Sequence, residues 1–192
     1  KNERTPVLVS AATAQAKAGD AFLALETAQG IDSLRYKSVV LARIAAAQEA
    51  SKKGGDALKT LDQARTAAKE IKKPFARDYA ISRVALTQSW IGRVRKNTDG
   101  LVAAAAFANT IKDKRLRAET LWTIAGQLRR LSGNDRAKAI NAMADTATDE
   151  IKSQLSQVWM FGDLSLVHLR HGETDAAWKA WQRGLNIAEH IQ

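Results

Sequence analysis

The pattern of apolar and polar positions along this chain indicates amphipathic helices. Lys37, Leu41, Ile44, Ala45 and Gln48 fall on one face at about 100° per residue, the spacing of a helix that packs on a neighbour. Residues of high helix propensity dominate, and only two prolines and eleven glycines interrupt the chain. The pattern therefore predicts an all-α protein.

The same helical pattern returns every 40 residues. Three apolar sets keep this spacing: Ile31, Ile71, Ile111, Ile151 and Ile191; Leu41, Ile81, Leu121 and Phe161; and Ile44, Val84, Ile124 and Leu164. Self-similarity at a fixed period of about 20 to 50 residues is typical of stacked structural repeats, each of which buries its apolar face against the next. We therefore expect residues 1–192 to form a single helical-repeat domain.

Turn residues divide each unit into two helices. An aspartate stands at the expected start of every second helix, where its carboxylate accepts hydrogen bonds from free amide groups. These residues are Asp20, Asp56, Asp99, Asp135 and Asp175. The expected helical hairpins cover residues 6–31, 34–73, 75–112, 114–152 and 153–192. The prediction is a right-handed α-solenoid of about five antiparallel helix pairs, or ten helices.

Two strings carry a resemblance to a known family. AQAKAGDAFLALETAQGI and LRHGETDAAWKAWQRGLNIAE resemble the tetratricopeptide core, in which small and aromatic residues flank a Gly-Asp turn. The unit here is 40 residues rather than about 34, and alanine replaces most of the family's large aromatics. HEAT units have a comparable length, but the Gly-Asp turns favour the tetratricopeptide-like branch. The resemblance implies scaffolding or peptide binding, with no catalytic residues to carry over.

Composition limits the classes of function. The chain has no cysteine, which excludes disulfides, cysteine-ligated zinc and thiol catalysis. The longest apolar run, Leu101 to Ala108, is far shorter than the roughly 20 residues that span a bilayer. The chain begins at Lys1 rather than methionine, which fits a mature exported protein or a trimmed chain. We expect a periplasmic or secreted location, with the cytoplasm as the alternative.

The charge is concentrated in the middle of the chain. Of the net +10, residues 41–80 contribute an excess of four basic residues and residues 81–120 an excess of five, whereas the last 32 residues have an excess of one acidic residue. An anionic partner would be drawn to the centre. Basic clusters at the ends of first helices, such as Lys52 with Lys53, also complement the helix dipole, so a solvated edge is the competing interpretation.

One face of the first helix in each hairpin is expected to stay open. Its positions correspond to residues 39, 43, 46 and 50 of the second hairpin, and helical solenoids use such an inner surface for binding. The candidate partner-binding residues are Arg43, Tyr79, Arg83, Leu86, Trp90, Glu119, Trp122 and Trp159. Aromatic residues and arginine often anchor partners. The alternative for Leu86, Tyr79, Trp90 and Trp122 is packing between hairpins.

Three further sets have structural interpretations. Lys37, Arg77 and Arg117 recur with the period and are expected to reach terminal carbonyls of the preceding helix, a pattern that is lost at Gln157. Trp178 and Trp181 are expected to close the end of the last hairpin. We expect no cofactor and no metal site. The spacing of His168, His171 and Glu173 is the one pattern that a metal could use.

The sequence therefore favours a non-catalytic interaction module that binds a protein or peptide segment on its inner face. An acidic partner segment would suit the basic middle of the chain. Nucleic-acid or polyanion binding through the basic middle is the alternative, because repeat proteins also bind single strands by stacking and backbone charge. A small-ligand or metal-dependent enzyme is the third hypothesis. Neither a phosphate-binding loop nor a nucleophile motif supports it.

Overall fold

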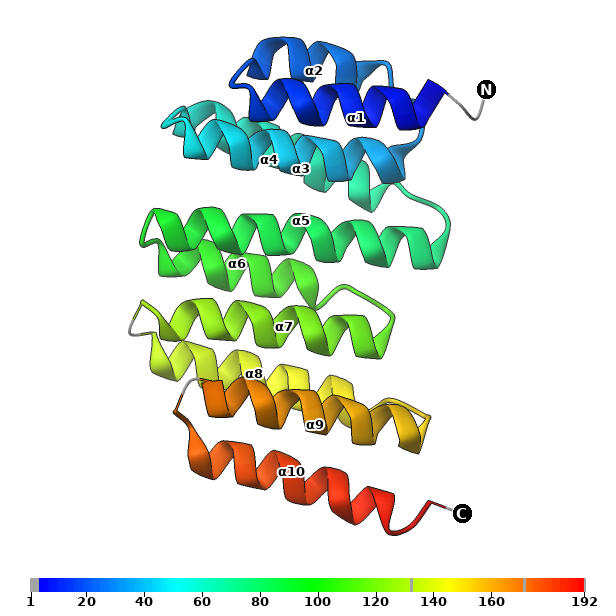
Figure 1. The fold of residues 1–192 in the computed structure, drawn as a ribbon, viewed down its shortest axis with the longest axis vertical. Coiled ribbons are helices and arrows are strands. Elements are labelled where there is room, and N and C mark those ends of the chain that lie inside the picture. Colours follow the sequence, from blue (N-terminus) through cyan, green and yellow to red (C-terminus); the bar gives the residue numbers. More distant parts are fainter. Residues whose placement is uncertain (1–3, 132, 171, 192) are drawn as a thin grey trace.

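The computed structural model describes residues 4–131, 133–170 and 172–191. These residues form ten α-helices and no β-strand, so the predicted all-α class is confirmed (Figure 1). The helices are α1 (Arg4–Lys17), α2 (Ala21–Gln29), α3 (Leu34–Ala50), α4 (Gly54–Lys69), α5 (Pro74–Val94), α6 (Thr98–Ala108), α7 (Lys114–Arg129), α8 (Asn134–Asp149), α9 (Gln154–Arg170) and α10 (Thr174–Ala188).

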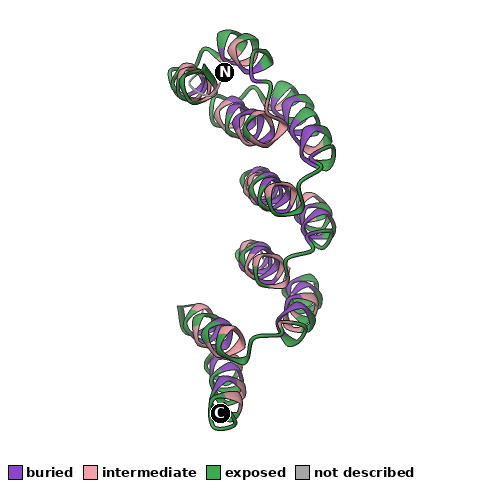
Figure 2. Ribbon diagram, turned by 90° about the vertical axis from the view of Figure 1, so that its right-hand side faces the viewer, coloured by how far each residue is buried: buried purple, intermediate pink, exposed green. Residues whose placement is uncertain are grey.

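Consecutive helices pack in pairs, and the pairs follow one another along the molecule. The pairs are α1 with α2, α3 with α4, α5 with α6, α7 with α8, and α9 with α10. The first four odd-numbered helices also pack side by side in chain order. Figure 2 shows the resulting arc, with the odd-numbered helices along its concave side and α4, α6 and α8 along its convex side. The two ends of the chain therefore lie at opposite ends of the molecule (Figure 1).

The core is the layer between the two rows of helices. Most members of the three apolar sets are buried there, including Ile31, Ile71, Leu41, Leu121 and Phe161, as the sequence pattern predicted. Ile151 is half-buried and Ile191 is exposed. Small residues let the paired helices approach closely: Ala24, Ala64, Ala104 and Ala144 are fully buried at 40-residue spacing, and Gly184 follows them. A Cβ at Gly184 would lie 3.2 Å from Cβ of Phe161.

Capping residues fix the helix starts. Oδ1 of Asp20 accepts a hydrogen bond from the amide of Leu23 at 3.0 Å, and the other four aspartates of the turn pattern lie within the first turn of their helices. Oδ1 of Asn97 accepts from the amide of Gly100 at 3.0 Å. Side chains thus satisfy amide groups that a helix leaves free at its first turn.

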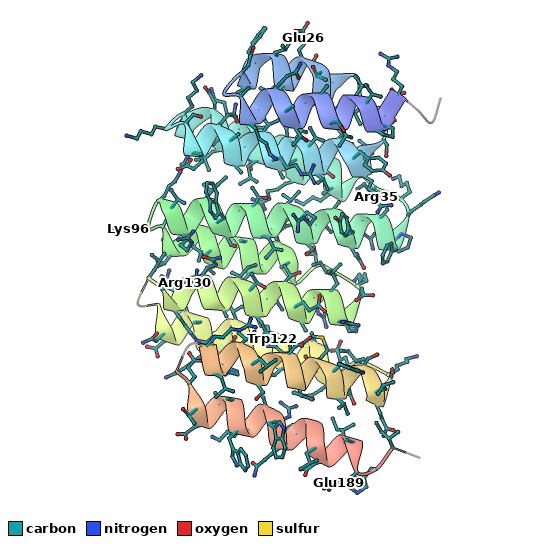
Figure 3. The ribbon with its side chains drawn as sticks, in the orientation of Figure 1. Glu26, Arg35, Lys96, Trp122, Arg130 and Glu189 are labelled. Atoms are coloured by element: carbon teal, nitrogen blue, oxygen red, sulfur yellow. The ribbon has the colours of Figure 1, made fainter. Side chains whose placement is uncertain are left out.

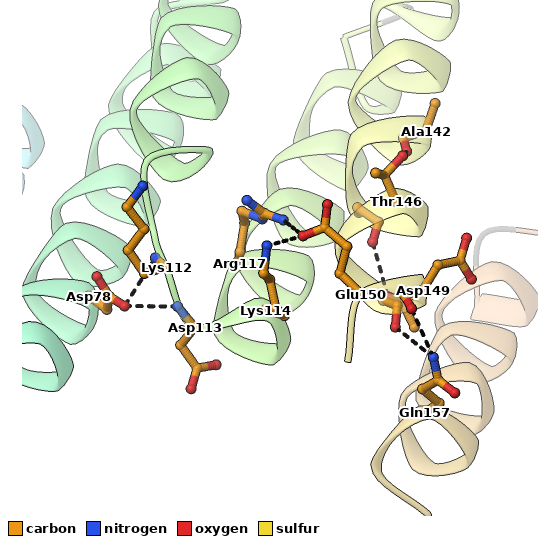
Figure 4. Close-up of polar contacts among 12 residues, drawn as sticks. Asp78, Lys112, Asp113, Lys114, Arg117, Ala142, Thr146, Asp149, Glu150 and Gln157 are labelled. Carbon is orange, nitrogen blue, oxygen red and sulfur yellow. Dashed lines mark hydrogen bonds and ion pairs between the residues drawn. The ribbon is translucent and has the colours of Figure 1, made fainter. Parts of the chain in front are cut away.

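Buried polar contacts join one hairpin to the next. The carboxylate of Asp78 in α5 is buried and accepts hydrogen bonds from the backbone amides of Lys112 and Asp113 at 3.0 and 2.8 Å (Figure 4). Ser82 and Thr120 share a buried hydroxyl hydrogen bond of 2.8 Å between α5 and α7. Two backbone donors on one carboxylate fix how the loop before α7 meets α5.

The predicted basic contacts at the helix ends are confirmed for one residue and wrong for another. Nζ of Lys37 donates to the carbonyl of Gln29 at the end of α2, as expected. Arg117 instead binds the carboxylate of Glu150, which also binds Lys114 (Figure 4). The Lys114 ammonium, and to a smaller extent the Arg117 guanidinium, lowers the pKa of the Glu150 carboxyl. Gln157 occupies the position where the pattern of basic residues was expected to be lost, and its side-chain amide donates to the carbonyls of Thr148 and Asp149 at 3.2 Å each. A side-chain amide therefore replaces the cation there.

Within the described part of the chain, no helix is long and apolar enough to cross a membrane.

Candidate functional site

A row of exposed side chains follows the concave face at 40-residue spacing. Arg43, Arg83, Thr123 and Asp163 project from the middle of α3, α5, α7 and α9, and all four are exposed. The row changes from positive to negative along the molecule. Among the described residues, Arg83 and Asp163 form no ion pair, whereas Nη1 of Arg43 donates to Oγ1 of Thr13 at 3.4 Å. Unpaired exposed charges of this kind are available to a partner.

Aromatic residues accompany this row near its basic half. Tyr79 is exposed on α5, and the guanidinium of Arg35 lies 5.4 Å from its ring centroid and 5.6 Å from that of Tyr36. Arg35 is labelled beside the α3–α5 seam in Figure 3. The cation packs on the Tyr79 ring, and the residue remains 37% exposed.

Leu86 and Trp90 contribute less surface than the sequence pattern suggested. Both are half-buried and pack against the apolar core. They therefore act in part as packing residues between hairpins, the alternative that the sequence left open. Trp159 on α9 is largely exposed and belongs to the open face.

A pocket of about 290 Å³ opens between α7 and α9. It is lined by Glu119, Trp122, Thr123, Gly126, Gln127, Arg130, Asp163 and Val167. Gly126 occupies the repeat position of Ala46, Leu86 and Leu166, so the missing side chain helps to form the hollow. Glu119 is half-buried and accepts from Nε of Arg115 at 2.9 Å.

Trp122 corrects the sequence-based expectation. It was predicted to be a partner-binding residue, but its side chain is only 5% exposed. The indole fills the space between hairpins at a position where the other repeats have Ala42, Ser82 and Gly162. In Figure 3 Trp122 lies toward the interior, whereas Arg130 reaches the edge of the molecule. Trp122 thus forms the wall of the pocket and is not an exposed anchor.

A second, larger cleft of about 930 Å³ separates the fourth and fifth hairpins. A chain of polar contacts crosses it: Nδ1 of His168 lies 2.5 Å from one carboxylate oxygen of Glu173, and Nε of Arg129 lies 2.6 Å from the other. Burial raises the pKa of the nearby Asp145 carboxyl, and the charge of Arg183 opposes this effect. The sequence reasoning missed this cleft. The sequence feature that could have indicated it is the pair Asn141 and Asp145, two polar residues at the repeat positions of Leu101 and Ala105.

The one spacing that a metal could use, His168, His171 and Glu173, lies only partly within the described residues. No group of three or more histidine, cysteine, aspartate and glutamate side chains in that part of the chain could hold a metal ion. His171 lies outside the described residues. His168 is instead engaged with Glu173, which explains its burial beside a charged neighbour.

Comparison of the chain with protein-family models, curated proteins and solved structures finds no match.

Proposed function

We propose that this protein is a non-catalytic interaction module that binds an extended or helical segment of a partner protein along its concave face. In this proposal the chain is a right-handed, tetratricopeptide-like solenoid with a 40-residue unit. The first residues of α3, α5, α7 and α9, which are Leu34, Pro74, Lys114 and Gln154, support that period.

The exposed row Arg43, Arg83, Thr123 and Asp163 is the observation that carries the proposal. One position on each of four neighbouring helices stays in solvent although the residue type changes, so the shape of the array keeps this line open. Tyr79, Trp159 and the pocket beside Glu119 add apolar surface next to the charges. A partner segment with an acidic residue near Arg83 suits this arrangement.

Many basic residues away from the concave face are already paired, which favours a peptide over a polyanion. Arg95 binds Glu49 and the carbonyl of Gly54, and Arg136 binds Asp99. Lys96 and Arg130 lie along the edge formed by the turns (Figure 3). Nucleic-acid binding would need a continuous cationic surface, and ion pairs interrupt this one.

Selection from a displayed library of short random peptides tests the proposal. Peptides enriched on the wild-type protein should carry an acidic residue and should bind Arg83→Glu about 10- to 100-fold more weakly. The thermal melt should not change, because Arg83 is exposed. Lys138→Glu makes the same charge change on α8 and should bind normally.

Two results would contradict the proposal. Selected peptides that bind Arg83→Glu and wild type equally would place the interaction elsewhere. Binding of unrelated single-stranded RNA that weakens steeply with salt, without peptide enrichment, would favour the polyanion alternative.

A further inference from the structure

We propose that the outer face of α10 is an interface through which two copies of this chain associate. Trp178, Trp181 and Leu185 lie three and four residues apart, so they share one face of the helix. They are 57%, 45% and 40% exposed. The two indoles stack on each other with centroids 5.1 Å apart and planes 19° apart. The two tryptophans, which were expected to close the end of the last hairpin, therefore leave an exposed apolar face on α10.

The repeat shows what such positions do elsewhere in the molecule. Position 181 corresponds to Leu61, Leu101 and Asn141, and position 185 corresponds to Arg65, Ala105 and Asp145. Leu61, Leu101 and Ala105 are buried in the assembled array. This side of an even-numbered helix faces the hairpin that follows: the Arg65 guanidinium, for example, lies 5.0 Å from the Phe107 ring centroid of α6. Apolar residues at positions 181 and 185 are therefore normally buried by the next hairpin.

Helix α8 has polar residues on the same face. Its residues at positions 138, 141 and 145 are Lys, Asn and Asp, and they line the large cleft. At the corresponding three positions α10 has Trp, Trp and Leu. A contiguous exposed apolar patch of this kind is rare on a protein that stays monomeric, because removing it from water is favourable.

The distribution of charge points to a second copy as the occupant. Of the +10 overall, residues 41–120 carry +9, so the middle of the array repels another copy, whereas the last 32 residues have a net charge of −1. An end-to-end pair brings these segments together and keeps the basic middles apart. A two-fold axis beside α10 sets each pair of tryptophans against its equivalent and closes the assembly at two chains.

Sedimentation equilibrium of the whole chain from about 1 to about 300 μM tests this inference. We expect a monomer–dimer equilibrium. The double variant Trp178→Lys/Trp181→Asn gives α10 the residues that α8 already accommodates, and it should dimerise at least about 30-fold more weakly. Trp159→Asn removes an exposed tryptophan from the concave face, and its dimerisation should match that of wild type.

A second measurement needs no variant. Tryptophan emission of the wild-type protein should shift to shorter wavelength as concentration rises through the dimer transition, because the indoles leave water. A monomer over the whole range would overturn the inference, whether its tryptophans are exposed or protected. Assemblies that keep growing beyond two chains would overturn the two-fold arrangement, and equally tight dimers of the α10 variant would overturn the assigned face.

The interface does not depend on the proposed peptide groove. Peptide binding by Trp178→Lys/Trp181→Asn should equal that of wild type, and Arg83→Glu should dimerise normally. Failure of one proposal can therefore be distinguished from failure of the other.

Discussion

The seam between the third and fourth hairpins differs from the seam between the fourth and fifth. In the first seam α7 packs closely on both α5 and α6, Ala105 is buried, and Ser82 shares a buried hydrogen bond with Thr120. In the second, α9 packs only lightly on α7 and α8, and a cleft of about 930 Å³ remains. The same repeat thus produces a closely packed seam and one that contains a solvent-accessible cleft, which we call the hydrated seam.

Ion pairs cross both seams, since Arg136 binds Asp99 in the first, but in the second they have less helix packing beside them. Across the second seam Arg183 of α10 binds Asp149 of α8, and Arg129 binds Glu173, which His168 also contacts from within the fifth hairpin. Dispersion and burial act at every close contact, whereas these ion pairs depend on geometry, salt and pH. The fifth hairpin should therefore separate from the rest of the array more readily than the others.

The largest expected effect comes from truncating one equivalent position in each region. Leu101 is fully buried on α6, so Leu101→Ala should destabilise the protein by about 2–5 kcal/mol. Asn141 holds the same repeat position on α8 and lines the cleft, so Asn141→Ala should change stability by less than about 0.5 kcal/mol. Chemical denaturation of both variants checks the difference. Similar losses would show that the two regions are equally packed.

The carboxylate at the hydrated seam should have the next largest effect. Glu173→Gln removes the partner of Arg129, whose side chain is mostly buried, and should cost about 1–2 kcal/mol. Hydrogen-exchange mass spectrometry should show faster exchange in α9 and α10 but not in α5 and α6. Arg115→Gln breaks the exposed Arg115–Glu119 pair as a control and should cost less than about 0.5 kcal/mol.

The opposite pattern of exchange would contradict the comparison. If Glu173→Gln loosens all five hairpins together, the array unfolds as one cooperative unit and the hydrated seam is no weaker than the others.

Much of the fold could be predicted because the 40-residue pattern fixes which residues face inward. The sets containing Leu41 and Ile44 are buried from the second hairpin to the fifth, and the described residues form the ten expected helices. Pro74, which falls between the expected hairpins 34–73 and 75–112, is the first residue of α5. Local periodicity and turn chemistry suffice for these features.

The site was harder to predict because burial at a seam depends on two hairpins at once. Trp122 shares its position with Ala42, Ser82 and Gly162, and no periodic pattern tells whether a large side chain there points into a gap or into solvent. The hydrated cleft likewise depends on two polar residues, Asn141 and Asp145, that replace apolar ones. The exposure of Arg83 was easier to predict, because a charged residue at a repeat position on the open face is expected to stay in water.

The smallest effect tests the electrostatics of the hydrated seam. Burial holds the pKa of the Asp145 carboxyl above its ordinary value of 3.8 in the folded protein, against the attraction of Arg183 and His168 and with the repulsion of Asp149. The folded state therefore binds this proton more tightly than the unfolded chain, and stability falls as the pH rises from about 3.8 through the raised pKa. Asp145→Asn removes the charge and should raise stability at neutral pH, by less than about 1 kcal/mol because the group is half-exposed.

The pH dependence separates this effect from a simple change in packing. Wild type and Asp145→Asn should have the same melting temperature below about pH 2.8, about one unit under the ordinary pKa of 3.8, where the carboxyl is protonated in both folded and unfolded protein, and should diverge as the pH rises. Asn141→Asp adds a carboxylate one helical turn away and should enlarge the fall in stability with pH. If Asp145→Asn melts below wild type at neutral pH, Arg183 stabilises the Asp145 charge more than burial destabilises it. The charged carboxylate would then contribute favourably to the contact between the fourth and fifth hairpins.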